Sequence, residues 1–199
     1  DIAFIGGGNM ASAIAGGLVR QGQAAARVLV IDPSVGQRQR LQQELGVATA
    51  EQADAQLAQA ATVVWAVKPQ QFKQAAVAAA AHAGGALHLS VMAGIRSDDL
   101  ARALGTERIV RSMPNTPALI GAGITGLYAR PTVSSDERER IDALLAPTGE
   151  RVWVAREQDL DAVTALSGSG PAYVFYFIET MVDAAQRMGL SAEQGRQLA

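Results

Sequence analysis

The chain has 199 residues, 49% of them hydrophobic, which is enough for one large or two small domains with a sizeable core. Its formal net charge of −2 argues against a nucleic-acid partner held by a general basic field. The absence of cysteine excludes a disulfide scaffold, a thiolate metal site and a cysteine nucleophile, and two histidines are too few for a multi-histidine metal site. We therefore expect neither a metal ion nor a nucleic acid among its ligands.

Neither a membrane span nor a signal peptide is expected. The apolar run of residues 171–178 is far shorter than the roughly 20 residues that a spanning helix needs. The first residues already have the pattern of a buried strand, which is not that of a signal peptide. We therefore expect no membrane contact and a cytoplasmic location.

The first stretch of the chain has the form of a dinucleotide-binding fingerprint. Residues 2–5 are apolar with high β propensity, and three glycines and a small-residue helix follow them. In the pattern G-x-G-x-x-A, Gly6 allows the turn out of the strand, Gly8 lets the backbone approach a pyrophosphate, and Ala11 lets the helix lie close to the sheet. Asp32 ends the next strand, where a ribose-binding acid is expected. A nucleotide site is the prediction, and a purely structural glycine turn is the alternative.

Predicted strands and helices alternate along the rest of the first 157 residues. The first helix is expected to end near Gln21 with Gly22 as its C-cap, and Gly46 stops the second helix, while Ser97 and Ser135 are expected as N-caps. Further strands are predicted at residues 28–31, from residue 47, and at 62–67, 87–91, 108–112, 124–129 and 151–154, with helices at 53–60, 70–83 and 98–104. This alternation predicts βαβ units in an α/β fold, with a doubly wound, mainly parallel sheet of the Rossmann type.

Three loops follow predicted strands at their carboxyl ends, where a parallel sheet binds ligands. Residues 66–69 (Ala-Val-Lys-Pro) follow one strand and residues 92–94 (Met-Ala-Gly) the next. In residues 113–117 (Met-Pro-Asn-Thr-Pro), the two prolines either fix a loop that displays Asn and Thr or form an ordinary proline turn. His88 lies inside a strand with no apparent partner group, so we expect a partly buried structural histidine rather than a catalytic one.

The pattern becomes wholly helical near residues 155–160, which indicates a domain boundary. Pro171 suits the first position of a helix, and residues 173–178 are apolar on every side, so this helix needs more cover than the remaining chain provides. A second subunit or missing chain must supply it. Ser191 and Gln194 form a capping box that opens another helix, within which the sequence stops. We therefore expect a fragment that lacks its true N-terminus and a C-terminal part.

Four motifs are similar, in order and spacing, to those of pyrroline-5-carboxylate reductase, at residues 5–10, 66–69, 113–117 and 166–173. The first (Ile-Gly-Gly-Gly-Asn-Met) is generic, whereas the last two together are specific to that family, and the resemblance covers essentially the whole chain. It implies an oxidoreductase that reduces 1-pyrroline-5-carboxylate to L-proline with a nicotinamide cofactor, the last step of proline biosynthesis. It also implies a Rossmann domain at residues 1–157 and, at 158–199, the beginning of a helical dimerisation and substrate domain in a homodimer or larger oligomer.

The resemblance also implies where ligands bind. Glu157 occupies the position of a glutamate that approaches the substrate. The family's later Gly-Gly-Thr loop, which holds the substrate carboxylate, is absent from this sequence, so we expect half a substrate site. Lys68 is expected to contact the cofactor through the backbone of its segment rather than to act as a catalytic lysine, and no general acid is identified. The expected cofactor-binding residues are Ile5, Gly6, Gly7, Gly8, Asn9, Met10, Asp32, Ser34, Ala66, Val67, Lys68, Pro69, Val91, Met92, Ala93 and Asn115.

Asp32 departs from the family pattern, in which NADPH is the usual donor and a small hydroxyl residue often meets its 2′-phosphate. A carboxylate accepts hydrogen bonds from a ribose 2′-OH but repels a 2′-phosphate, so Asp32 by itself favours NADH. Ser34, Arg38 and Arg40 follow closely, and an arginine turned inward would neutralise both groups. We therefore expect both NADP(H) and NAD(H) to work.

Two other functions remain as alternatives. One is a different reductase of similar architecture, such as a β-hydroxyacid dehydrogenase, which usually relies on a catalytic lysine in its helical domain. No lysine occurs after Lys73, which counts against it. The other is a non-catalytic nucleotide-sensing module, in which the glycine loop binds a nucleotide but nothing reacts.

Overall fold

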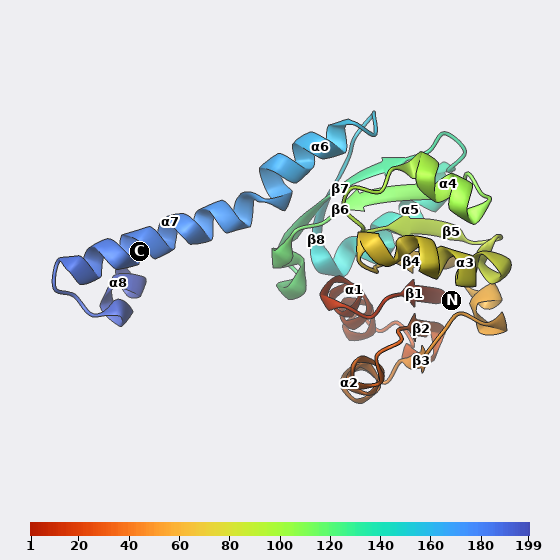
Figure 1. The fold of residues 1–199 in the computed structure, drawn as a ribbon, viewed down its shortest axis with the longest axis horizontal. Helices are drawn as coiled ribbons and strands as arrows, with labels where there is room; N and C mark the ends of the chain where they lie inside the picture. The colour runs from red at the N-terminus through yellow and green to blue at the C-terminus, as the bar shows by residue number, and fades with distance from the viewer.

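A computed structural model describes all 199 residues as one eight-stranded sheet covered by helices, from which a helical arm projects (Figure 1). The strand order is β3-β2-β1-β4-β5-β6-β7-β8, and every neighbouring pair is parallel except the antiparallel pair of β6 and β7. The chain winds from β1 to one edge and then from β4 to the other, which confirms the predicted doubly wound, mainly parallel sheet. The strands are β1 (Ile2–Ile5), β2 (Val28–Ile31), β3 (Ala48–Ala50), β4 (Thr62–Trp65), β5 (Leu87–Ser90), β6 (Ile109–Met113), β7 (Gly123–Ala129) and β8 (Gly149–Trp153).

Each face of the sheet has its own hydrophobic core. Helices α1, α2 and α5 cover one face with a cluster of 19 buried residues, and α3 and α4 cover the other with a cluster of 16. Neighbouring residues of one strand enter opposite clusters, as Phe4 and Ile5 do in β1, because successive side chains of a strand point to opposite faces. These helices are α1 (Asn9–Arg20), α2 (Val35–Leu45), α3 (Phe72–Ala83), α4 (Ser97–Leu104) and α5 (Ser135–Leu145).

Several predicted boundaries needed correction. The segment predicted as a helix at 53–60 is the short 3₁₀ helix η2 (Ala55–Gln59), and the helix predicted from residue 70 begins with the 3₁₀ turn η3 (Pro69–Gln71). Strand β4 ends at Trp65, two residues early, because Pro69 holds Lys68 extended and turns the chain out of the sheet. The remaining strands agree with the predictions to within one or two residues.

The two predicted serine N-caps are each displaced by one residue. Helix α5 is capped by Ser134, whose hydroxyl accepts the amide hydrogen of Glu137 in a complete capping box, and the predicted Ser135 is the first helical residue. In α4 the N-cap is Arg96, and the hydroxyl of Ser97 bonds outside its own helix. The predicted cap at Gly46 is confirmed, whereas the C-cap of α1 is Gln21, one residue before the predicted Gly22, which follows with a positive φ.

His88 is fully buried and has two hydrogen-bond partners, which corrects the prediction of a partly buried residue without partners. Its Nδ1 accepts the indole N–H of Trp65 at 3.0 Å, so its Nε2 carries the hydrogen and donates it to the carbonyl oxygen of Ala83 at 3.1 Å. Burial is the main cause that lowers the pKa of His88 from 6.5 to about 4. The expected structural role is confirmed, because both ring nitrogens are occupied inside the core.

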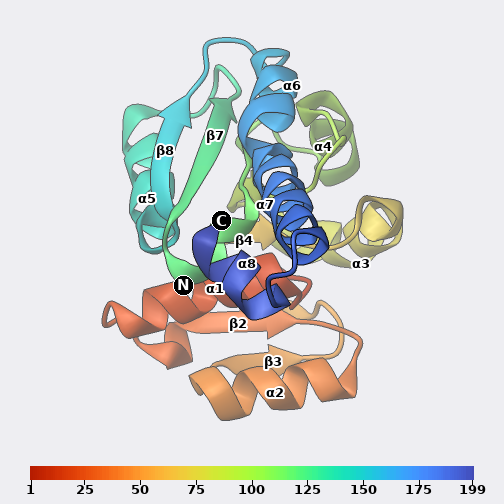
Figure 2. The same cartoon turned by 90° about the vertical axis from the view of Figure 1, so that its left-hand side faces the viewer.

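The C-terminal segment first packs on the sheet and then leaves it. Helix α6 (Asp159–Val163) and the π-helical turn η6 (Thr164–Gly168) lie against β6 and β7, where a Cβ at Gly126 would stand only 2.6 Å from Val163. Helix α7 (Gly170–Arg187) then projects outward, and α8 (Ala192–Leu198) folds back on it (Figures 1 and 2). No helix combines the length and the hydropathy that crossing a bilayer requires.

Candidate dinucleotide-binding site

The three glycines after β1 have different surroundings. Gly6 has φ +95°, and a Cβ there would be 2.7 Å from the carbonyl oxygen of Ala66, so only glycine fits. A Cβ at Gly7 would press on Leu41 at 2.9 Å, whereas at Gly8 it would meet no atom within 4 Å. Gly8 therefore borders open space, and it is the N-cap of α1, which has no side-chain cap. The free N–H groups of this helix start face that space and fit a pyrophosphate.

Asp32 braces the glycine loop from the end of β2. Its Oδ2 accepts the amide hydrogen of Gly7 at 2.8 Å, and its Oδ1 accepts that of Ser34 at 2.8 Å. Gln37 of α2 donates to the carbonyl oxygen of Gly7, so both backbone groups of this glycine are held. Asp32 thus stabilises the conformation of the glycine loop, a role that the sequence did not reveal, in addition to any contact with a ribose.

Arg38 and Arg40 of α2 are the two arginines that the sequence offered to neutralise Asp32 and an anionic ligand, and only Arg38 contacts Asp32. Arg38 donates to the backbone carbonyl oxygen of Asp32 at 2.7 Å and stands 3.5 Å from Glu51. Arg40 donates to the hydroxyl of Ser12 on α1 at 3.0 Å. Both cations therefore lie beside the glycine loop, where they reduce the repulsion between Asp32 and an anionic ligand.

A cleft of about 320 Å³ opens between the carboxyl ends of β1, β2 and β4 and helix α3. Ile5, Gly6 and Val67, all predicted cofactor residues, contribute to its lining. Its volume lies within the range of small-molecule sites. Next to the cleft, Ala66 donates its amide hydrogen to the carbonyl oxygen of Ile5 at 2.8 Å, and Lys68 is exposed.

The loop after β5 lies at the same edge, because β5 is parallel to β4. The amide of Val91 donates to the carbonyl oxygen of Trp65 at 3.1 Å, which joins this loop to the end of β4. The side chain of Met92 is buried in the core on the α3 and α4 face, so only its backbone is available to a ligand. Ala93 is exposed.

Asn115 follows β6 at this edge, and both groups of its side-chain amide are already used. Its Oδ1 accepts the amide hydrogen of Ile124 at 3.0 Å, and its Nδ2 donates to the carbonyl oxygen of Ser167 at 3.3 Å. The side chain therefore ties the proline loop to β7 and to η6, and the predicted cofactor contact of Asn115 stays a prediction.

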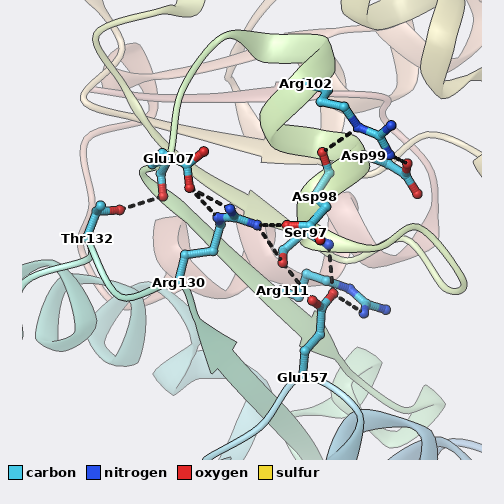
Figure 3. Close-up of polar contacts among 9 residues, drawn as sticks. All are labelled: Ser97, Asp98, Asp99, Arg102, Glu107, Arg111, Arg130, Thr132 and Glu157. Carbon is cyan, nitrogen blue, oxygen red and sulfur yellow. Dashed lines mark hydrogen bonds and ion pairs between the residues drawn. The ribbon is translucent and has the colours of Figure 1, made fainter.

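Glu157 lies where the helical segment begins, beside Ser97 and Arg111 (Figure 3). Its Oε1 accepts hydrogens from the amide of Ser97 at 2.7 Å and from Nη1 of Arg111 at 2.6 Å, and its Oε2 accepts the Ser97 hydroxyl hydrogen at 2.7 Å. Burial opposes ionisation of this carboxyl, but the hydrogen bonds from Ser97 and the charge of Arg111 outweigh it and lower the pKa of Glu157 below its usual value. Glu157 is therefore an ionised, firmly held group.

Sequence analysis missed Ser97 and Arg111 as partners of Glu157. Arg111 is a charged residue in the otherwise buried strand β6, and such a residue usually has a buried counter-charge, which was the available signal. The identity of the partner was not readable, because Glu157 lies 46 residues further along the chain.

Comparison with known proteins gives matches over the whole chain. The family model described as pyrroline-5-carboxylate reductase dimerisation matches residues 157–199, and that described as NADP oxidoreductase coenzyme F420-dependent matches residues 1–94. The chain is 43% identical to pyrroline-5-carboxylate reductase of Pseudomonas aeruginosa, with 99% of this chain and 73% of the relative covered. It is 39% identical to that of Escherichia coli, with 100% of this chain and 74% of the relative covered.

Solved structures agree with the sequence matches. The structure of a pyrroline-5-carboxylate reductase from Coxiella burnetii has a TM-score of 0.90 at 36% identity and covers 99% of this chain and 74% of its own. The Plasmodium falciparum pyrroline carboxylate reductase with NADP bound has a TM-score of 0.87 at 28% identity, over 100% of this chain and 73% of its own. A reductive aminase from Aspergillus terreus, at 18% identity and a TM-score of 0.75, shares the fold.

Proposed function

The chain belongs to the pyrroline-5-carboxylate reductase family, and from this premise we propose how its residues serve the reaction. It is an oxidoreductase that reduces 1-pyrroline-5-carboxylate to L-proline with NAD(P)H, the step that completes proline biosynthesis. When bound, the reduced nicotinamide supplies a hydride to the carbon of the C=N bond. The protein's tasks are therefore to bind the two reactants, to orient them and to exclude water.

The observation that carries the cofactor site is the open space at Gly8 in front of the uncapped start of α1. We assign the pyrophosphate to this position and the adenosine to the adjacent cleft of about 320 Å³. The nicotinamide then lies toward the loop after β5, along the edge formed by β1, β4 and β5. The residues we propose to hold the cofactor are Ile5, Gly6, Gly7, Gly8, Asn9, Met10, Asp32, Ser34, Ala66, Val67, Lys68, Pro69, Val91, Met92, Ala93 and Asn115.

On the substrate side we propose Glu157 as the residue that borders the imine. Hydride addition to an imine needs one proton on nitrogen and no nucleophilic side chain. His88 cannot provide that proton, because both its ring nitrogens are bonded to Trp65 and Ala83 in the core. We propose that the imine arrives protonated and that the ionised Glu157 stabilises its positive charge.

We propose a division of the chain at Glu157, with the nucleotide-binding domain at residues 1–157 and the helical substrate and dimerisation domain from residue 158. Helix α7 is then the interface of a homodimer, because its exposed aromatic side chains need apolar cover. The cytoplasm is the location we propose, since that compartment supplies NAD(P)H.

Oxidation of NADPH and NADH by the full-length protein, supplied with 1-pyrroline-5-carboxylate, tests the function. The matched variants are Gly8→Ala and Gly36→Ala, because a Cβ meets no protein atom within 4 Å at either position. We expect Gly8→Ala to weaken cofactor binding about tenfold or more, since its methyl group would occupy ligand space, and Gly36→Ala to behave as wild type. Absence of turnover by folded, cofactor-bound wild type would refute the function, and turnover of a β-hydroxyacid instead would identify the rival reductase.

A further inference from the structure

Helix α4 is capped from a distant part of the chain. Its own N-cap residue, Arg96, makes no capping hydrogen bond with its side chain. The carboxylate of Glu157, 60 residues further along the chain, instead accepts both the amide hydrogen and the hydroxyl hydrogen of Ser97 at 2.7 Å. A carboxylate at a helix N-terminus gains from the helix dipole and from charge-assisted hydrogen bonds. This contact therefore holds two elements together that are remote in sequence.

The direction of the Ser97 hydroxyl is determined by a second neighbour. Nη1 of Arg130 lies 3.1 Å from the Ser97 oxygen and is only a donor, so it occupies a lone pair of that oxygen. The hydroxyl hydrogen is thereby left to point at Glu157. Arg130 is itself held by Asp98 and, at 2.6 Å, by Glu107 (Figure 3).

Arg111 makes the arrangement costly to break. Arg111 lies at the centre of β6, and only 6% of its side chain is exposed. Its Nη1 donates to Oε1 of Glu157 at 2.6 Å. Removing the carboxylate would leave a buried cation without its partner. Arg111 is in register with Ser90, the last residue of β5, so the carboxylate is held at the level where the loop after β5 begins.

The contact joins two parts of the proposed active site. Ser97 begins α4 directly after the loop of residues 91–96, so its contacts hold the end of the loop proposed to meet the nicotinamide. Only Gln158 separates Glu157 from α6, whose Leu160 is buried and whose Val163 packs on Gly126 without room for a side chain there. A displacement at Ser97 would therefore move the cofactor loop and the substrate side relative to each other.

We infer that Ser97 and Arg111 are positioning residues, which hold the Glu157 carboxylate in one orientation and so set the helical domain against the cofactor loop. This inference rests on the proposed function, because it concerns the placement of the imine relative to the nicotinamide. Both residues bond directly to the Glu157 carboxylate. They act through Glu157, which keeps about one of its four acceptor positions free for a ligand.

A double-mutant cycle in the full-length protein tests the inference with Ser97→Ala, Glu157→Ala and the double variant. We expect Ser97→Ala to lower kcat for 1-pyrroline-5-carboxylate about tenfold, with the dissociation constant of NADPH unchanged, because misplacement affects the chemical step. It should have no further effect in the Glu157→Ala background, since its partner is already gone. Ser97→Thr, which keeps the hydroxyl, should return kcat to within about twofold of wild type.

Two control variants remove a serine and an arginine that do not contact the Glu157 carboxylate. Ser135→Ala removes a serine from the first position of α5, and Arg102→Ala breaks the exposed pair with Asp99 within α4. Both should leave kcat within about twofold of wild type, because exposed ion pairs contribute little. Independent effects of Ser97→Ala and Glu157→Ala that multiply in the double variant would overturn the inference.

A second readout does not depend on turnover. Amide hydrogen exchange of Ser97 and of residues 158–163 should accelerate at least tenfold in Glu157→Ala. If Glu157→Ala does not fold, the same acceleration is expected in Glu157→Gln. Unchanged exchange in a folded variant would also overturn the inference. If wild type lacks imine reductase activity while exchange responds as expected, the proposed function fails and the contact between Ser97 and Glu157 stands.

Discussion

The sheet domain and the arm formed by α7 and α8 use their apolar residues in opposite ways. In the sheet domain, helices on both faces bury clusters of 19 and 16 residues. In the 18 residues of α7, only Ala185 is buried, although the helix carries four aromatic side chains. The difference teaches that apolar composition does not by itself make a core. A core also needs a second surface, which the sheet domain supplies from its own chain and the arm does not.

The aromatic side chains of α7 show what the arm requires. Tyr173, Phe175, Tyr176 and Phe177 are each more than half exposed. Exposed apolar surface on this scale marks an interaction site. The match of residues 157–199 to a dimerisation family indicates a homo-oligomer, and the arm is where we propose that the chains meet.

The largest expected effect follows from placing a charge on the arm. Phe177 is 66% exposed, and Phe177→Asp should abolish self-association. In a symmetric dimer the substitution is present in both chains, so the lost burial of apolar surface weakens the binding free energy by about 3–6 kcal/mol. This raises the dissociation constant at least a hundredfold. Analytical ultracentrifugation of the full-length protein measures it.

Val77→Asp is the matched control for this experiment. Val77 is 82% exposed, but it lies on α3 of the sheet domain, so the same type of substitution should leave self-association unchanged. A Phe177→Asp protein that assembles like wild type would remove the contrast between the two regions.

The next effect tests the sheet domain's core. Leu41 is fully buried and packs beneath Gly7, so Leu41→Ala should lower the free energy of unfolding by about 3 kcal/mol through the cavity it leaves. Leu198→Ala on α8 removes a 73% exposed side chain and should change it by less than about 0.5 kcal/mol. Urea denaturation compares the two, and equal losses would show that the arm is as well packed as the sheet.

A pH-dependent effect is confined to the sheet domain. The pKa of His88 is lowered to about 4 in the folded chain, below its ordinary 6.5, so the unfolded chain binds a proton first as pH falls. Stability from this group is complete above pH 6.5 and is lost toward pH 4, at about 1.4 kcal/mol per pH unit within that window.

His88→Gln tests this assignment, because glutamine can still accept from Trp65 and donate to Ala83. The slope of unfolding free energy between pH 6.5 and 4 should flatten in His88→Gln and persist in His82→Gln, which alters the partly exposed histidine of α3. An unaltered slope in His88→Gln would assign the pH dependence to other groups.

The smallest expected effect concerns the choice between NADPH and NADH. Asp32→Ser should raise the ratio of kcat/KM for NADPH over NADH about five- to tenfold, since one carboxylate near the surface contributes about 1 kcal/mol of repulsion. Because Asp32 also bonds to Gly7 and Ser34, both cofactors should bind more weakly in the variant. A constant ratio of kcat/KM for the two cofactors would mean that Asp32 stabilises the glycine loop but does not select between NADPH and NADH. Self-association should not change in either case.

Local patterns predicted most of the sheet domain. The glycine turn at Gly6, the C-cap at Gly46 and the order of strands and helices were all readable, because each depends on residues close in sequence. Element ends were less accurate, as with β4 and the two serine caps, since one residue more or less costs little free energy. The antiparallel direction of β7 was not predicted, because strand direction is decided by pairing with β6.

The sequence by itself therefore determined the nucleotide-binding fold, the place of its glycine loop and the need of α7 for a partner. The tertiary structure decided which polar groups meet. Asp32 braces Gly7, Trp65 bonds to His88, and Glu157 caps α4 beside Arg111. The reason is physical: backbone propensities and hydrophobic periodicity act over a few residues, whereas a buried polar side chain takes whichever partner the folded chain brings within about 3 Å.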